Sequence, residues 1–86
     1  MPLKVACEIY KFNIENKPVW FGKLVESMEG VVSKNTISES LDTLTDWMII
    51  KGHYGATGDG RASYLYEIDP DQVTMIKELY EKYWRK

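Results

Sequence analysis

The segment Val32–Met48, VSKNTISESLDTLTDWM, constrains the fold most, because its pattern predicts one amphipathic helix. Its apolar residues recur at spacings of four, three and four, as a 3.6-residue helix needs in order to dock one edge on a core. These residues are Ile37, Leu41, Leu44 and Met48. The opposite edge is polar and rich in hydroxyl groups. Two starts are open: Ser33 as the N-cap, or Thr36 in a capping box with Glu39.

Composition limits the chain to one small domain, residues 1–86. At 44% hydrophobic, 86 residues supply a single modest core. The net charge of −2 does not attract nucleic acid or an acidic membrane, so a DNA-binding surface would have to be local. No apolar run approaches the about eighteen residues of a membrane span, and the N-terminus lacks the features of a signal peptide. We therefore expect a cytoplasmic protein with no membrane partner.

The sequence offers little for a catalytic or metal site. Cys7 has no second cysteine and no histidine at metal-ligand spacing, which favours a small buried hydrophobe. His53 stands alone near the end of a predicted strand, where a surface or packing role is the common one. No nucleophile–base pair, P-loop or dinucleotide-binding pattern occurs. We therefore expect no enzyme activity, catalytic residue, metal or cofactor.

Two further amphipathic segments precede Val32. Residues 3–15 carry apolar groups on more than one face, typical of a helix that is central to the core or shared with a partner subunit. Asn16-Lys17-Pro18 ends it, and Val19 can form a short extended piece. Residues 20–28 predict a second, short helix, with Gly30 as a left-handed exit. Two short helices joined by a turn that contains glycine outline a helix-turn-helix.

After Met48 the pattern changes to strands. Residues 49–54 and 62–68 are rich in β-branched and aromatic side chains, and they flank the glycine-rich segment 55–60. This predicts a hairpin with a loose tip, and Tyr64, Tyr66 and Ile68 would share one side. The segment 69–72, Asp-Pro-Asp-Gln, then starts a last helix, with aspartate at the cap and glutamine three residues later.

This order of elements accompanies a resemblance to a known group. GVVSKNTISESLDTL, residues 30–44, resembles the turn and recognition helix of small bacterial and archaeal winged helix-turn-helix transcription regulators. YEIDP, residues 66–70, resembles the end of their wing and the start of their last helix. The resemblance implies a mostly helical α+β fold with three helices, a two-stranded β wing and a C-terminal helix. The chain departs from the pattern at Met48, where those regulators commonly have glycine.

The resemblance also implies a DNA site. The recognition helix, about residues 33–47, would lie in the major groove of double-stranded DNA, and the wing, residues 55–61, would reach the backbone or the minor groove. Lys34 can reach phosphate or guanine, and Asn35 can form a bidentate pair with adenine. The candidate DNA-binding residues are Ser33, Lys34, Asn35, Thr36, Ser38, Glu39, Thr57 and Arg61. The implied function is sequence-specific transcription regulation.

Acidic residues on the same helix argue against this function. Glu39, Asp42 and Asp46 against Lys34 give the segment an excess of negative charge. Asp42 and Asp46 would lie near phosphate if the helix lay flat in the groove, so the DNA-binding hypothesis requires that only its first turn or two enter. Arg61 has an alternative role as a solubilising strand residue beside a plain turn. The alternative function is a winged-helix protein–protein interaction module without DNA binding.

The terminal helices predict a homodimer. The end of a terminal helix frays unless it is packed, so we expect its aromatic side chains to pack on the first helix, on another subunit, or on both. A two-fold dimer would also double the DNA contact. The expected interface residues are Leu3, Tyr10, Ile76, Tyr80, Tyr83 and Trp84. The alternative is a monomer whose last helix closes its own core.

Overall fold

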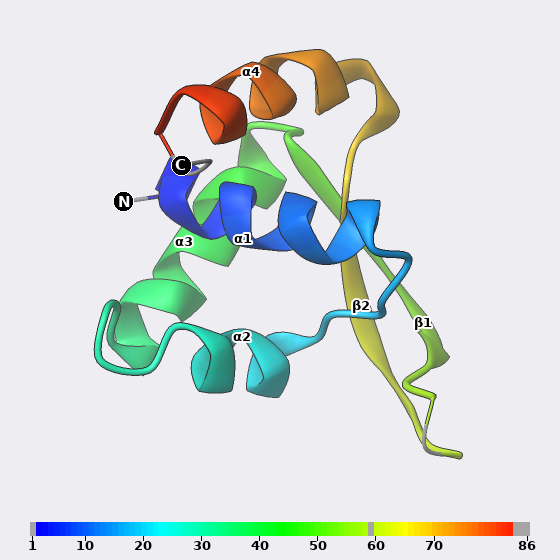
Figure 1. The fold of residues 1–86 in the computed structure, drawn as a ribbon. Helices are drawn as coiled ribbons and strands as arrows, with labels where there is room; N and C mark the ends of the chain where they lie inside the picture. Colours follow the sequence, from blue (N-terminus) through cyan, green and yellow to red (C-terminus); the bar gives the residue numbers. More distant parts are fainter. Residues whose placement is uncertain (1, 59, 84–86) are drawn as a thin grey trace.

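The computed structural model describes residues 2–58 and 60–83 (Figure 1). The elements, in chain order, are α1 Pro2–Ile14, α2 Phe21–Ser27, α3 Lys34–Asp46, β1 Ile50–Ala56, β2 Ala62–Ile68, a 3₁₀ turn Pro70–Gln72 and α4 Val73–Tyr83. This order confirms the predicted fold class, and the boundaries of α1, α2 and α3 lie within two residues of their predicted places.

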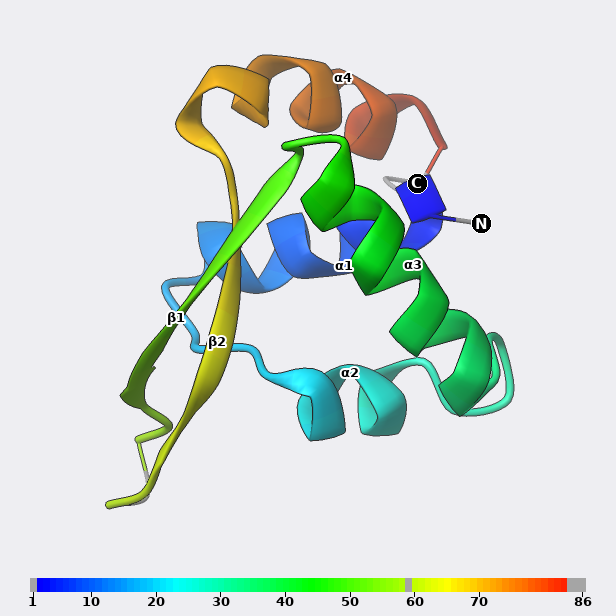
Figure 2. The same cartoon turned by 180° about the vertical axis from the view of Figure 1, so that it is seen from behind.

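Helix α1 occupies the centre of the molecule. It lies between α4 and α2 in both views and also packs against α3 and β2 (Figures 1 and 2). The consecutive residues Val5 to Tyr10 are all buried, and since successive helical residues point about 100° apart, they cover every side of the helix. The apolar residues on more than one face of α1 are therefore explained by its position within the protomer.

Helix α3 is capped by a side chain at its N-terminus and by a left-handed residue at its C-terminus. Ser33 is the N-cap, and its Oγ accepts a hydrogen bond from the Thr36 backbone N–H at 3.2 Å. At the other end, Met48 adopts a left-handed conformation with φ of 60°. Its N–H donates to Thr45 O and the Ile49 N–H donates to Leu44 O, both at 3.0 Å, which is the Schellman pattern. Met48 therefore takes the place of the missing glycine. The prediction that it docks on the core is wrong, since it is 72% exposed.

The two strands form an antiparallel hairpin, with Ile50 opposite Ile68 and Tyr54 opposite Tyr64. Pairing continues to Ala56, two residues beyond the predicted end of the first strand, because Gly55 and Ala56 are small enough to remain in the ladder. Val19 O accepts a hydrogen bond from Tyr66 N–H at 2.9 Å. Trp20 also forms an isolated bridge with Leu65, so the extended piece predicted at Val19 is confirmed and it lies along the outer edge of β2.

The last helix starts later than its cap signal predicts. Asp69 caps the 3₁₀ turn, with its Oδ1 accepting from Asp71 N–H at 2.9 Å, and α4 follows only at Val73. The reciprocal capping bond expected of Gln72 is absent, because the Asp69 backbone N–H already donates to Ile49 O at 2.9 Å. This bond instead joins the start of α4 to the end of α3. Gly30 does adopt the left-handed conformation, with φ of 81°.

Candidate nucleic-acid interface

The first two turns of α3 present a set of exposed polar side chains. Lys34, Asn35, Ser38 and Glu39 are exposed, and none of them has a hydrogen-bond or ion-pair partner in the part of the chain that the structure describes. The first turn contains no acidic residue. These four side chains are therefore available to a ligand, as the sequence predicts.

The cap residues of α3 are less available. The Ser33 hydroxyl donates to Thr36 Oγ1 at 2.8 Å and accepts from the Thr36 backbone N–H. Both hydroxyl groups hold the helix start together, so each can contribute to a phosphate contact only through its remaining hydrogen-bonding capacity. The backbone amides of this turn, together with the helix dipole, still favour an anion at this end.

The wing tip is a closed turn. Thr57 N–H donates to Arg61 O at 3.0 Å, and the Thr57 hydroxyl donates to the same oxygen at 3.4 Å. Gly58 and Gly60 have φ of 95° and 90°, which only glycine adopts without strain. Thr57 thus serves mainly to close the turn, while the side chain of Arg61 is exposed beside it.

The N-terminal end of α3 and the wing tip lie at the same edge of the molecule. Both views show this edge at the bottom, with α2 between the two features (Figures 1 and 2). Lys34 is the first residue of α3, and Arg61 closes the wing turn. The two groups of candidate DNA-binding residues therefore lie at the two ends of one edge, with α2 between them.

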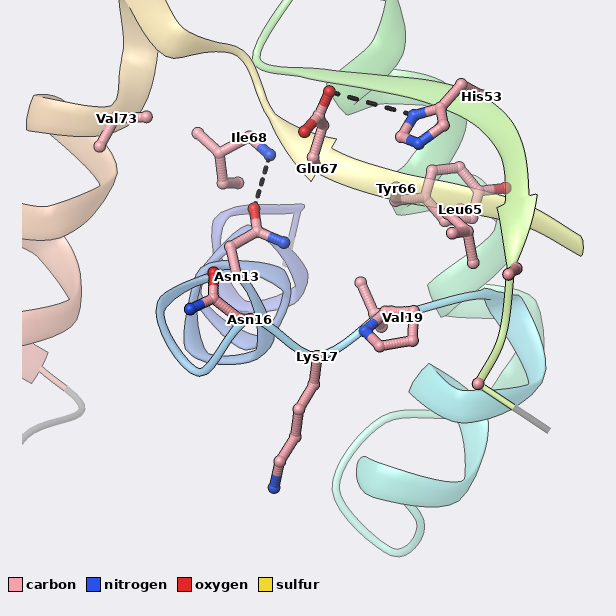
Figure 3. Close-up of a pocket in the computed structure, with 13 residues that line it drawn as sticks. Asn13, Asn16, Lys17, Val19, His53, Leu65, Tyr66, Glu67, Ile68 and Val73 are labelled. Atoms are coloured by element: carbon pink, nitrogen blue, oxygen red, sulfur yellow. Dashed lines mark hydrogen bonds and ion pairs between the residues drawn. The ribbon is translucent and has the colours of Figure 1, made fainter.

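The base of the wing is fixed to α1. Asn13 Oδ1 accepts a hydrogen bond from Ile68 N–H at 2.9 Å, and both residues line an open cleft of about 590 Å³ between α1 and the wing (Figure 3). Glu67 lies on the rim of this cleft, with its Oε1 4.0 Å from His53 Nδ1 and 3.7 Å from Lys51 Nζ. Ion pairs this exposed contribute little stability. The backbone bonds and Asn13 set the direction of the wing relative to α3.

The two aspartates of α3 lie in its C-terminal half, whereas Glu39 lies in its second turn. Asp42 and Asp46 line a second cleft, of about 470 Å³, together with Leu41, Thr45, Tyr64 and Tyr66. Asp46 lies twelve residues after Lys34, which corresponds to about 18 Å along the helix axis. The two carboxylates thus face the wing strand at a distance from the N-terminal turn.

The residues expected at a dimer interface fall into different environments. Ile76 is fully buried and Tyr10 is 8% exposed, both within the protomer's own core. Tyr80 packs on Tyr10 with ring centroids 5.3 Å apart, so the last helix closes on the first. Leu3 is exposed, whereas the side chain of Tyr83 and the whole of Trp84 lie outside the described residues.

Two partly buried hydrogen bonds have no signal in the sequence. Glu8 is buried on α1, and its Oε2 accepts a hydrogen bond from the Ser27 hydroxyl at 2.6 Å, which joins α1 to α2. Asn13 joins the wing to α1 by accepting a hydrogen bond from the Ile68 N–H. Neither position is distinguished from an ordinary surface residue by periodicity. Both act on the site by holding α2 and the wing in place.

Cys7 is 3% exposed, which confirms the prediction of a buried residue. Burial, with a smaller contribution from Glu8, raises the pKa of its thiol above the usual value. The described part of the chain contains no cluster of three or more potential metal-ligating side chains. None of the helices in that part is both long enough and apolar enough to cross a bilayer.

The turn between α2 and α3, the central α1 and the anchored hairpin define a winged helix-turn-helix fold. The structure is similar to the crystal structure of Pex from Synechococcus sp. strain PCC 7942, with a TM-score of 0.63. That similarity covers 99% of this chain and 83% of that one, at 19% sequence identity. No family model and no curated protein matches the sequence.

Proposed function

We propose that this protein binds double-stranded DNA as a sequence-specific transcription regulator. The observation that carries the proposal is the common edge formed by the N-terminal turns of α3 and the wing tip (Figure 2). Lys34, Asn35 and Ser38 would read the major groove from that edge, while Arg61 would contact phosphate or the minor groove. This edge has a cationic side chain at each end, and the α3 end adds the amide of Asn35 and the backbone amides of the first turn, all of which can donate to phosphate.

The position of the acidic residues supports entry by the N-terminal end of α3. If the helix lay flat in the groove, Asp42 and Asp46 would approach phosphate and oppose binding. If the helix enters end-on, only Glu39 comes close, and its carboxylate can accept from the amino group of cytosine. The first turn then contributes its backbone amides as well as Lys34.

A dimer is part of the proposal. One winged helix reads few base pairs, and a two-fold pair doubles the length of the site. The exposed Leu3 on α1 and the exposed face of α4 would supply the interface, while Tyr10 and Ile76 would support it from within the protomer. The expected molecular mass in solution is twice the 10.0 kDa of one chain.

The proposal is tested by removing each cationic anchor in turn. Lys34→Ala and Arg61→Ala should each weaken binding to a fluorescent random-sequence duplex, because each removes one phosphate contact per protomer. For a dimer, each change should lower the slope of log affinity against log salt by about 2. Fluorescence anisotropy at several salt concentrations measures that slope.

Lys11→Ala is the matched control, since Lys11 is exposed near the end of α1, belongs to neither the candidate DNA-binding residues nor the proposed dimer interface, and its removal changes the net charge equally. It should leave the slope of the parent unchanged. The site assignment is wrong if Lys34→Ala and Arg61→Ala both bind DNA as tightly as the parent. An equal loss in all three would instead show that DNA responds to net charge without a defined interface.

A further inference from the structure

One face of the wing carries a row of three tyrosine rings. Tyr54 lies opposite Tyr64 in the ladder, and their ring centroids are 5.3 Å apart at an interplanar angle of 76°. Tyr64 and Tyr66 follow at 5.5 Å and 80°. Such edge-to-face pairs are favourable arrangements of aromatic rings. Tyr54 is nevertheless 78% exposed and Tyr64 is 43% exposed, so this row has no covering element within the described residues.

Gly52 makes the row possible. It lies opposite Tyr66, and a Cβ at this position would come within 2.2 Å of the Tyr64 ring. The ring of Tyr64 therefore lies directly over the backbone of β1, where any side chain at position 52 would displace it. We name the three rings together with Asp42 and Asp46 the tyrosine–aspartate surface.

The inner end of this surface is the cleft of about 470 Å³ between β2 and α3. Tyr64 and Tyr66 form one wall, and Asp42 and Asp46, one helical turn apart, stand on the other. Neither carboxylate has an ion-pair partner among the described residues, and no lysine or arginine lines the cleft. Burial, and after it the nearby Tyr64 and Asp42, raise the pKa of the Tyr66 phenol, which keeps this phenol neutral beside the two carboxylates.

We propose that the tyrosine–aspartate surface binds an arginine side chain presented by an extended segment of a protein partner. A guanidinium group can stack on a tyrosine face and at the same time donate two parallel hydrogen bonds to a carboxylate. Lysine offers the charge without the planar donor geometry. DNA is a poor occupant, because its phosphates would meet Asp42 and Asp46. The row of rings continues outward to Tyr54 and would support the residues that flank the arginine.

This site is separate from the proposed DNA edge. Asp42 lies eight residues after Lys34, so the cleft is about 12 Å further along the axis of α3. A partner could therefore occupy the tyrosine–aspartate surface without covering the first turn of α3. The proposal does not depend on DNA binding, and its test contains no DNA.

The test is a titration of the ¹⁵N-labelled protein followed by amide chemical shifts. The probe is the acetylated and amidated peptide Gly-Ser-Arg-Ser-Gly, and the comparison peptide has citrulline, which is similar in shape but uncharged, in place of arginine. We expect the arginine peptide to cause saturable shifts at Asp42, Asp46, Tyr64 and Tyr66. The affinity of the citrulline peptide should be lower than that of the arginine peptide by a factor of about ten or more, since citrulline lacks the charged donors.

A pair of double variants separates the site from general charge effects. Asp42→Asn with Asp46→Asn should weaken the arginine peptide about tenfold or more, whereas Glu78→Gln with Glu81→Gln on α4 makes the same change in net charge and should have no effect. The parent-like spectrum of each variant shows that it is folded. The proposal is overturned if the arginine peptide gives no saturable shift, if both double variants lose it equally, or if spermidine produces the same shifts with equal affinity.

Discussion

Met48 takes a backbone conformation that glycine adopts far more readily than any other residue, with φ of 60°. Its side chain is mostly exposed, so it gains little packing in return. A side chain in this conformation costs about 1 kcal/mol or more. We therefore expect Met48→Gly to stabilise the domain by about 1 kcal/mol, as measured by urea denaturation.

Met48→Ala is the control for this prediction. It removes nearly the same side-chain atoms but keeps a Cβ in the left-handed conformation, so its free energy of unfolding should stay close to that of the parent. If alanine stabilises as much as glycine, the effect comes from the exposed methionine side chain, and strain at the end of α3 is excluded as the cause.

Cys7 provides a second prediction for a single residue. Because its thiol is buried and its pKa is raised, little thiolate is present in the folded protein at pH 8. Ellman's reagent should modify it slowly in the native state and at once in denaturant. Since the folded pKa exceeds the unfolded one, this group should also lower stability as the pH rises above its usual value. Rapid native-state modification would contradict the placement of Cys7 in the core.

At the scale of elements, α2 is a short helix held to α1 partly through Glu8 and Ser27. Ser27→Ala removes the hydroxyl donor from a buried carboxyl group, and we expect a loss of about 1 kcal/mol in the free energy of unfolding. Ser38→Ala is the matched control, because Ser38 is an exposed helical serine without a partner among the described residues. Equal stability of the two variants would show that the Ser27 hydrogen bond contributes nothing to the docking of α2.

The elements themselves could be predicted from periodicity and caps. The spacing of Ile37, Leu41 and Leu44 predicted the buried edge of α3, and the N-cap Ser33 was one of the two starts that the sequence left open. The end of α3 could not be predicted, because Met48 shares its apolar character with core residues and only the backbone reveals its role. The partners of Glu8 and Asn13 were equally hidden, since each contact joins segments far apart in the chain.

For the whole molecule, the sequence could name the candidate residues but could not place them relative to one another. The start of α3 and the wing tip lie at the two ends of one edge, and Asn13 and Val19 contribute to this arrangement by fastening the wing to the helical core. The tyrosine–aspartate surface arises in the same way, from side chains of β1, β2 and α3 that local patterns do not connect. Long-range packing, which is absent from local periodicity, decides both surfaces.

The oligomeric state is a prediction at this scale as well. Light scattering during size-exclusion chromatography should give twice the mass of one chain, with Leu3→Glu returning it to 10.0 kDa because a charge would enter the apolar interface. Lys23→Glu on α2, outside the proposed interface, is the control and should keep the mass of the dimer. If the parent protein has the mass of one chain, the dimer proposal is wrong and the protein is a monomeric winged helix.

The salt dependence of binding to random-sequence duplex DNA tests the central claim most directly. With Lys34 and Arg61 contacting phosphate in each protomer of a dimer, raising the salt from about 50 to about 200 mM should weaken binding on the order of 100-fold. Fluorescence anisotropy of the parent protein measures this change. Absence of binding at the lower salt, where non-specific affinity is greatest, would contradict the account and favour a protein-interaction module.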